Sequence, residues 1–150
     1  MVRILLASDF SADATVALEM AKETAQRFEA EVLVLHVDQG AVAAPLSAEA
    51  AARREGARGR LASICNELAR DQIPALPLLR TGDPAREILR VAADRGVSLI
   101  VIGTHGAALS RSHLLLGSVA DRVLRYASAP VLTVRHPDHV PPSPWGSFTN

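Results

Sequence analysis

The chain has few aromatic residues, a single cysteine and a single lysine, and it has no long apolar run. Only five of its 150 residues are aromatic although 49% are hydrophobic, so the core must be built from Ala, Val, Leu and Ile. The lone Cys65 excludes an intramolecular disulfide, and its place in an apolar helical pattern predicts a core position. No run approaches the ~20 apolar residues of a membrane-spanning helix, and the apolar stretch at the N-terminus is too short for a signal peptide. We therefore expect a cytoplasmic protein.

The chain also has no net charge at neutral pH. The 16 acidic and 16 basic residues cancel, and no basic stripe stands out, so neither nucleic acid nor an anionic membrane is an expected partner. Fifteen of the basic residues are Arg, whose planar fork suits phosphate and carboxylate. The same bias can equally follow from genome composition. His113, His136 and His139 lack zinc-ligand spacing with any Cys or His, so no metal site is predicted.

Short apolar runs alternate with longer segments of helical periodicity. The runs read as continuous apolar stretches, which is typical of strands buried on both faces of a parallel sheet. This order predicts an α/β fold with an open five-stranded parallel sheet and helices on both faces. We expect one domain over residues 1–135, followed by a Pro-rich tail over 136–150. The predicted strands are Ile4–Ala7, Val32–Val37, Ala75–Leu79, Leu99–Ile102 and Val131–Val134.

Four helices are predicted between these strands. The first follows Ser11 as N-cap, the second covers Ser47–Arg70, and the third begins at Asp83-Pro84 and stops at Gly96. The fourth begins at Ser118, with Asp121 completing a capping box. Two apolar faces are expected to be buried: Ala14, Ala17, Leu18, Ala21, Ala25 and Phe28 on the first helix, and Val119, Val123 and either Tyr126 or Ala127 on the fourth.

The last 15 residues break the pattern. Residues 136–150 contain four prolines and Trp145, which argues against helix and central strand. We expect an extended tail whose order depends on whether Trp145 docks on the domain.

Polar and glycine residues follow two of the predicted strands. In an open α/β sheet, ligands bind beyond the carboxyl ends of the strands, where the strand order reverses. Asp9 follows the first strand, Gly103-Thr-His-Gly106 follows the fourth, and Gly117-Ser118 opens a helix. Glycines let backbone N–H groups approach phosphate oxygens, and a helix N-terminus adds unpaired donors and partial positive charge. The pattern is neither a Walker loop nor a Gly-x-Gly-x-x-Gly motif.

Each of these residues also has a structural explanation. Gly103 can serve as a strand-end turn, Ser118 as an N-cap, and Asp9 as an Asx-turn residue. His105 can donate to phosphate or lie exposed in a loop, and Arg111 can cover phosphates as a fork or remain solvated. Spacing alone therefore leaves phosphate binding and a structural role equally open. No nucleophile–base pair, paired acids or metal cluster predicts catalysis.

Several segments form a recognisable series along the chain: Ile4–Ser11, Leu35–Val37, Gly82–Ile88, Gly103–Gly106, Gly117–Ala120 and Ala129–Leu132. In this order they resemble the motifs of the universal stress protein family, from about residue 2 to residue 135. The resemblance implies strand order 3-2-1-4-5, a homodimer paired through the last strand, and ATP binding, with Mg²⁺ or Mn²⁺, where present, held by the phosphates.

The resemblance also assigns residue roles. Asp9 would contact adenine or ribose, Val37 would line the adenine pocket, and Val119 would contribute its backbone N–H. Ribose and phosphates would be held by Gly103, Gly106, Gly117 and Ser118, and the expected binding set also includes Ala7, His105 and Arg111. This chain departs from the family pattern in two ways: ten residues rather than nine separate Gly106 from Gly117, and Ala7 stands where ATP-binding relatives often have Pro.

Three functions follow as hypotheses. The first is a stress-associated regulatory module that binds ATP, or a related adenine nucleotide, as a homodimer. The second is a slow ATPase on the same scaffold, with His105 or Asp9 orienting a water molecule. The third is a dimeric scaffold that binds no nucleotide and acts through its dimer surface or its tail, which the extra loop residue and Ala7 favour.

Overall fold

The computed structural model describes residues 1–40, 46–105, 116–139 and 143–146. All five predicted strands and all four predicted helices form, within a few residues of their expected bounds. In chain order the elements are β1 (Arg3–Ala7), α1 (Ala12–Phe28), β2 (Glu31–Asp38), α2 (Ala48–Arg70), β3 (Ala75–Thr81), α3 (Pro84–Asp94), β4 (Leu99–Gly103), α4 (Ser118–Tyr126), β5 (Val131–Val134) and a 3₁₀ turn, η1 (Pro137–His139).

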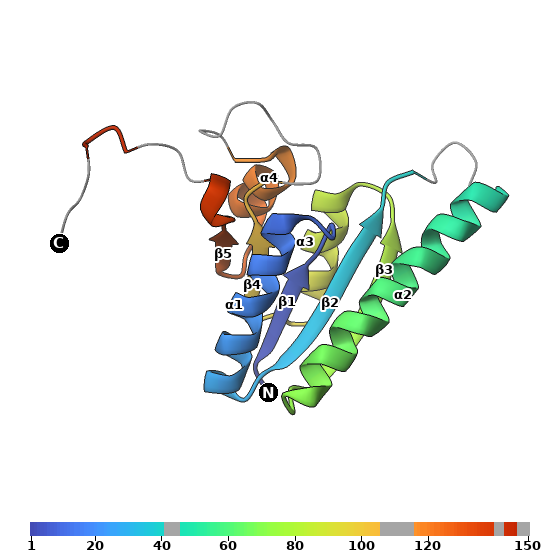
Figure 1. Cartoon of the computed structure of the whole chain (residues 1–150), viewed down its shortest axis with the longest axis horizontal. Coiled ribbons are helices and arrows are strands. Elements are labelled where there is room, and N and C mark those ends of the chain that lie inside the picture. Colours follow the sequence, from blue (N-terminus) through green and yellow to red (C-terminus); the bar gives the residue numbers. More distant parts are fainter. Residues whose placement is uncertain (41–45, 106–115, 140–142, 147–150) are drawn as a thin grey trace.

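The strands form one parallel sheet in the order β3-β2-β1-β4-β5, as expected (Figure 1). β1 lies at the centre, where Ile4 pairs with Val32 of β2 on one side and with Leu99 of β4 on the other. The chain winds outward from β1 in both directions, so the connections after β1 and β4 diverge. This divergence opens a crevice at the carboxyl ends of the strands.

Alternating side chains of the central strands divide the core into two layers. Ile4 and Leu6 face α1 and α2, whereas Leu5 and Ala7 face α3 and α4. The helices therefore cover both faces of the sheet in pairs, α1 with α2 and α3 with α4 (Figure 1). The Ala-rich stripe of α1 packs closely because Ala17 and Ala21 are fully buried against the sheet.

Burial on both faces holds for the three inner strands only. β1, β2 and β4 are almost continuously buried, as their apolar runs predict, but β3 and β5 are half-exposed. The expectation of full burial was wrong for these two strands because they form the edges of the sheet. Pro77 within β3 fits this position, since an edge strand tolerates a residue without an N–H donor.

Three helices begin with a side-chain cap and the fourth does not. The side chains of Ser11, Ser47 and Asp83 accept a backbone N–H in the first turns of α1, α2 and α3. The predicted capping box of α4 is wrong: its N-cap is Gly117, no side chain caps it, and Ser118 is already the first helical residue. A glycine at the N-cap supplies no side-chain acceptor.

The predicted apolar face of α1 is wrong at Phe28, which is 63% exposed because the helix ends there; buried Ala30 occupies the adjacent core position as the chain enters β2. The predicted face of α4 is confirmed: Val123 is buried, and Val119 and Ala127 pack against the same core cluster. Of the two alternatives for its last position, Ala127 faces the sheet and Tyr126 is 68% exposed.

Beyond β5, the described part of the tail contains η1 and ends near Trp145. The Trp145 side chain is 83% exposed and does not dock on the domain. None of the helices in the described ranges has the length and hydrophobicity needed to cross a membrane.

Candidate functional site

A pocket of about 640 Å³ lies at the carboxyl ends of β1, β2 and β4, against the first turns of α3 and α4. Gly106 and Arg111 lie outside the described residues, and so does most of the ten-residue segment between Gly106 and Gly117. Every other residue of the predicted binding set lines this pocket: Ala7, Asp9, Val37, Gly103, His105, Gly117, Ser118 and Val119. Residues separated by more than 100 positions thus meet at the crevice that the strand order creates.

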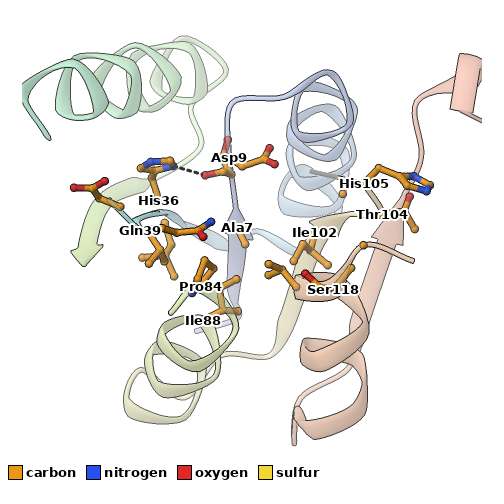
Figure 2. A pocket seen from close by; sticks show the side chains of 18 of the residues that line it. Ala7, Asp9, His36, Gln39, Pro84, Ile88, Ile102, Thr104, His105 and Ser118 are labelled. Carbon is orange, nitrogen blue, oxygen red and sulfur yellow. Dashed lines mark hydrogen bonds between the residues drawn. The ribbon is translucent and has the colours of Figure 1, made fainter. Parts of the chain in front are cut away.

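The floor of the pocket is apolar. Ala7 and Ile102 come from adjacent strands, and Pro84 and Ile88 come from the first turns of α3 (Figure 2). Together with Val37 they belong to, or border, the core layer between the sheet and the α3–α4 pair. A flat apolar floor of this kind can accept the face of a planar ring by excluding water from it.

The N-terminus of α4 forms one end of the pocket. The first intrahelical bond of α4 runs from the Asp121 N–H to the Gly117 oxygen at 2.9 Å. The N–H groups of Ser118, Val119 and Ala120 therefore have no partner within the helix, and among the described residues no side chain caps the helix. All three residues line the pocket. Three open donors and the positive end of the helix dipole make this end suited to an anion.

The start of α4 is fixed to the sheet through Thr104. The Gly117 N–H donates to the Thr104 oxygen at 2.6 Å. The Thr104 N–H and hydroxyl both donate to the Val134 oxygen of β5, each at 2.8 Å. The open donors of α4 are thus held in place by β4 and β5, and the Gly117 N–H is engaged within the protein.

Gly103 has a packing role that its sequence position does not reveal. A Cβ atom there would lie 2.8 Å from the Cβ and 3.1 Å from the carbonyl carbon of Asp13, at the start of α1. Real Cβ atoms do not approach so closely, so the residue must be glycine for α1 to sit against the end of β4. Its φ is not in the left-handed region, so a special turn is not the reason.

Asp13 fixes the segment that follows Gly103. This fully buried carboxylate accepts the His105 N–H at 2.9 Å through Oδ2 and the His136 N–H at 3.0 Å through Oδ1. The His105 ring is 3% exposed, its Nδ1 lies 3.6 Å from Asp13 Oδ2, and it is turned away from the centre of the pocket (Figure 2). The backbone N–H of His105 is therefore used internally, and its ring is not presented for proton transfer to a bound ligand.

Asp9 forms the turn predicted for it and also lies at the pocket. Its Oδ1 accepts the Ser11 N–H at 3.0 Å, which is the predicted Asx turn, and the residue also lines the pocket. His36 is held nearby by a 2.8 Å hydrogen bond between its Nδ1 and the Ser8 oxygen (Figure 2). The His36 ring stacks on Phe10 at 4.3 Å between centroids, so its role here is structural.

The opposite end of the pocket contains an ion pair that the sequence did not suggest. Asp38, the last residue of β2, is 4% exposed, and its Oδ1 lies 2.9 Å from Nε of Arg53 on α2. The Gly40 N–H donates to the same oxygen at 3.2 Å. The Arg53 guanidinium, followed by the Gly40 N–H, holds the pKa of the Asp38 carboxyl below its usual value despite burial. Asp38 is therefore ionised at neutral pH.

Sequence reasoning missed Asp13, Asp38 and Arg53 for different reasons. Asp13 resembled any acidic residue in a first helical turn. Asp38 follows a predicted strand, so the rule that singled out Asp9 applies to it equally and could have found it. Arg53 lies on the exposed side of α2, and nothing in the local sequence pattern indicates that its side chain reaches Asp38. Across the described ranges, His, Cys, Asp and Glu side chains form no group of three that could hold a metal ion.

Comparison with known proteins agrees with this architecture. The model of the universal stress protein family matches residues 1–135. The universal stress protein YxiE of Bacillus subtilis is 31% identical over 89% of this chain and 98% of its own length. The structure of the universal stress protein MJ0577 from Methanocaldococcus jannaschii superposes on this one with a TM-score of 0.79 at 29% identity. The match covers 90% of this chain and 96% of that one. A universal stress protein of Archaeoglobus fulgidus solved in complex with dAMP shares the fold, with a TM-score of 0.69 at 23% identity over 89% of this chain and 98% of that one. The chain belongs to the universal stress protein family.

Proposed function

We propose that this chain is a stress-associated regulatory module that binds an adenine nucleotide, ATP in particular, and acts as a cytoplasmic homodimer. The uncapped N-terminus of α4, which opens onto the pocket, is the observation that carries the proposal. α1, α2 and α3 all have side-chain caps, whereas within the described ranges no side chain caps α4, whose first residues line the pocket. A ligand phosphate would occupy the N–H donors of these residues.

The remaining features of the pocket suit the rest of a nucleotide. A planar base would lie on the apolar floor formed by Ala7, Val37 and Ile102, and Asp9 at the end of β1 is in position for a ribose hydroxyl. The relative in complex with dAMP supports an adenine nucleotide as the ligand class. ATP has about 31 non-hydrogen atoms, and ~0.3 kcal/mol per atom gives a ceiling near −9 kcal/mol, equivalent to roughly micromolar affinity or slightly tighter.

The most direct test removes one donor from α4 without disturbing the helix. Ser118→Pro deletes the Ser118 N–H at the first helical position, where proline is well tolerated. Gly117 precedes it with φ −59° and ψ 153°, a backbone conformation that a following proline accepts. Loss of a hydrogen bond to a charged group costs about 1.5–3 kcal/mol, so we expect affinity for ATP to fall at least tenfold.

Ser118→Ala is the matched control, because it removes the hydroxyl and keeps the N–H. Isothermal titration of nucleotide-free protein with ATP, ADP and AMP should show near-normal binding for Ser118→Ala and weak binding for Ser118→Pro. Equal loss in both variants would assign the contact to the hydroxyl instead of the backbone. No heat from the unmodified protein at millimolar nucleotide would reject nucleotide binding altogether.

The dimer is proposed through β5. This strand is an edge of the sheet, with Val131, Leu132 and Thr133 only half-buried, so its outer backbone groups are available to pair with another strand. Sedimentation velocity at micromolar concentration should show a dimer. Thr133→Pro should shift the population toward monomer, because the register of β5 on β4 turns the Thr133 N–H outward. A monomer from the unmodified protein would reject this part of the proposal.

A slow ATPase activity is the alternative hypothesis. The His105 ring is buried beside Asp13 and turned away from the centre of the pocket, so it is not presented to a bound ligand. We therefore propose a binding role first.

A further inference from the structure

Asp13 is a fully buried acidic residue in the first turn of α1, and it is not among the described residues that line the nucleotide pocket. A carboxylate is seldom buried unless hydrogen bonds replace its water. Its Oδ2 accepts the N–H of His105, two residues after β4, and its Oδ1 accepts the N–H of His136, two residues after β5. Asp13 therefore joins three segments that are far apart in the sequence.

The first of these segments holds the phosphate end of the pocket. Gly103 packs so closely on Asp13 that a Cβ would lie 2.8 Å from the Asp13 Cβ, and His105 is bonded to the Asp13 carboxylate. Thr104 lies between these two contacts, and its oxygen accepts the Gly117 N–H at the start of α4. The position of the open α4 donors therefore depends on Asp13, although Asp13 itself would not touch the ligand.

The second segment is the base of the tail. The Val134 oxygen accepts both the N–H and the hydroxyl of Thr104, each at 2.8 Å, and the His136 N–H reaches Asp13 at 3.0 Å. The tail thus leaves the domain beside α1, gripping the same segment that holds α4 (Figure 1). None of the described residues after β5 lines the pocket, so these bonds are the connection between the tail and a ligand.

A carboxylate suits this junction better than any other side chain of its size. It accepts hydrogen bonds through both oxygens, whereas an amide would present an NH₂ group to one of the two N–H donors. Its negative charge also strengthens both bonds and is favourable in the first turn of a helix. Removal of either donor leaves one oxygen without its bond, so the Asp13 side chain can turn and the other donor is fixed less strictly.

We propose that Asp13 is a positioning residue for the nucleotide phosphate and that it couples the phosphate end of the pocket to the base of the tail. This inference rests on the proposed nucleotide-binding function and adds a route by which that site is regulated. A phosphate on α4 stabilises Thr104 and His105 in their places on Asp13, and Asp13 holds His136. By linkage, an interaction that draws the tail away from α1 weakens phosphate binding by the factor with which bound phosphate resists it.

The test compares ATP with adenosine, which lacks the phosphates. Isothermal titration gives the dissociation constant of ATP, and displacement of ATP gives that of adenosine. In Asp13→Asn the preference for ATP over adenosine should fall at least about fivefold, the lower end of typical coupling between sites. Glu23→Gln is the matched control, because Glu23 is an exposed carboxylate on the same helix, paired with Arg27 and remote from the pocket; its preference should equal that of the unmodified protein.

His136→Pro tests the tail contact without altering the buried carboxylate. It removes the N–H that Asp13 accepts, and the preference for ATP should again fall at least about fivefold. His136→Ala keeps this N–H and removes only the ring, so it separates the backbone bond from the side chain. The reciprocal measurement is hydrogen–deuterium exchange of the His136 amide in the unmodified protein, which saturating ATP should slow more than saturating adenosine does.

These measurements distinguish positioning from simple stability. Equal losses of affinity for ATP and adenosine, or an unaltered preference in folded Asp13→Asn and His136→Pro, would overturn the positioning role and leave nucleotide binding intact. Exchange of the His136 amide at the same rate with ATP as with adenosine would overturn the coupling to the tail. Absence of binding by ATP and adenosine alike in the unmodified protein would instead reject the proposed function, and this inference with it.

Discussion

Gly103→Ala tests whether the close approach of α1 to β4 is as tight as described. The added methyl group would lie 2.8 Å from the Asp13 Cβ and 3.1 Å from the Asp13 carbonyl carbon. Neither atom can rotate away, because one is backbone and the other is attached directly to it. Relief therefore requires α1 to move, which would also strain the two hydrogen bonds that Asp13 accepts from the segments after β4 and β5.

The expected loss can be estimated from known substitutions. Overpacking of a well-packed interior typically costs about 1–3 kcal/mol, and the involvement of backbone places Gly103→Ala in the upper half of that range, at ~2–3 kcal/mol. For a chain of this length, each kcal/mol lowers the melting temperature by about 2–4 °C, so a decrease of roughly 4–12 °C should follow. Urea unfolding should show a lower midpoint with an unchanged slope.

Gly56→Ala is the matched control, because nothing lies within 4 Å of a Cβ added there. Gly56 lies in the middle of α2, where alanine is favoured over glycine by about 1 kcal/mol. The same chemical change should therefore stabilise the protein at position 56 and destabilise it at position 103. If Gly103→Ala unfolded at the same urea concentration as the unmodified protein while Gly56→Ala behaved as expected, the packing of α1 on β4 would be described wrongly.

Three further substitutions test the polar contacts. Asp13→Asn should lower the free energy of unfolding by about 2–3 kcal/mol in urea titrations, because an amide NH₂ would face a backbone N–H donor in a fully buried site; stability within ~0.5 kcal/mol of the original would contradict this. Arg122, and then the backbone N–H of Arg86, lowers the pKa of Asp83. The stabilisation that the ionised Asp83 gives the fold is therefore present above about pH 3.8 and is lost as the pH falls through the lowered folded-state pKa. Asp83→Asn should make the free energy of unfolding depend less on pH in that acid range, and an unchanged slope would count against the pairing. Asp71 and Glu67 raise the pKa of Lys22, so its contribution to the free energy of unfolding is present below about pH 10.5 and is lost as the pH rises through the raised folded-state pKa. Lys22→Met should lower the free energy of unfolding by ~1 kcal/mol at neutral pH and leave it unchanged at the alkaline extreme. A loss that persisted at the alkaline extreme would assign the effect to packing instead.

The sheet and its helices were predictable because their determinants are local and repeated. The continuous apolar runs indicated strands, and the Asp83-Pro84 start and Gly96 stop of α3 follow from the chemistry of capping and positive φ. The burial of residues near the end of a helix was harder to predict. Whether Phe28 is buried, and whether Tyr126 or Ala127 faces the sheet, depends on where the helix stops relative to the sheet, which the period of 3.6 residues does not specify.

Within the predicted binding set, the sequence indicated which residues lie near the ends of strands, but not which contacts they make. Asp9, Gly103 and Gly117 were found because parallel strands bring their carboxyl ends together, and the structure places all three around one pocket. The reason for Gly103 could not be predicted, since its constraint comes from Asp13, 90 residues earlier in the chain. Contacts such as Asp38 with Arg53 depend on how a helix crosses the sheet, and no local pattern encodes that crossing.

The bond between Gly117 and Thr104 changes the meaning of the unusual ten-residue spacing. Because the Gly117 N–H donates to the Thr104 oxygen at 2.6 Å, residues 104 and 117 are held together at a separation that is set by this bond. Closing a ten-residue rather than a nine-residue connection between fixed ends costs only about 0.1 kcal/mol of chain entropy. One residue more between Gly106 and Gly117 therefore leaves the anchored start of α4 in place, and the spacing by itself does not argue against a ligand at this helix.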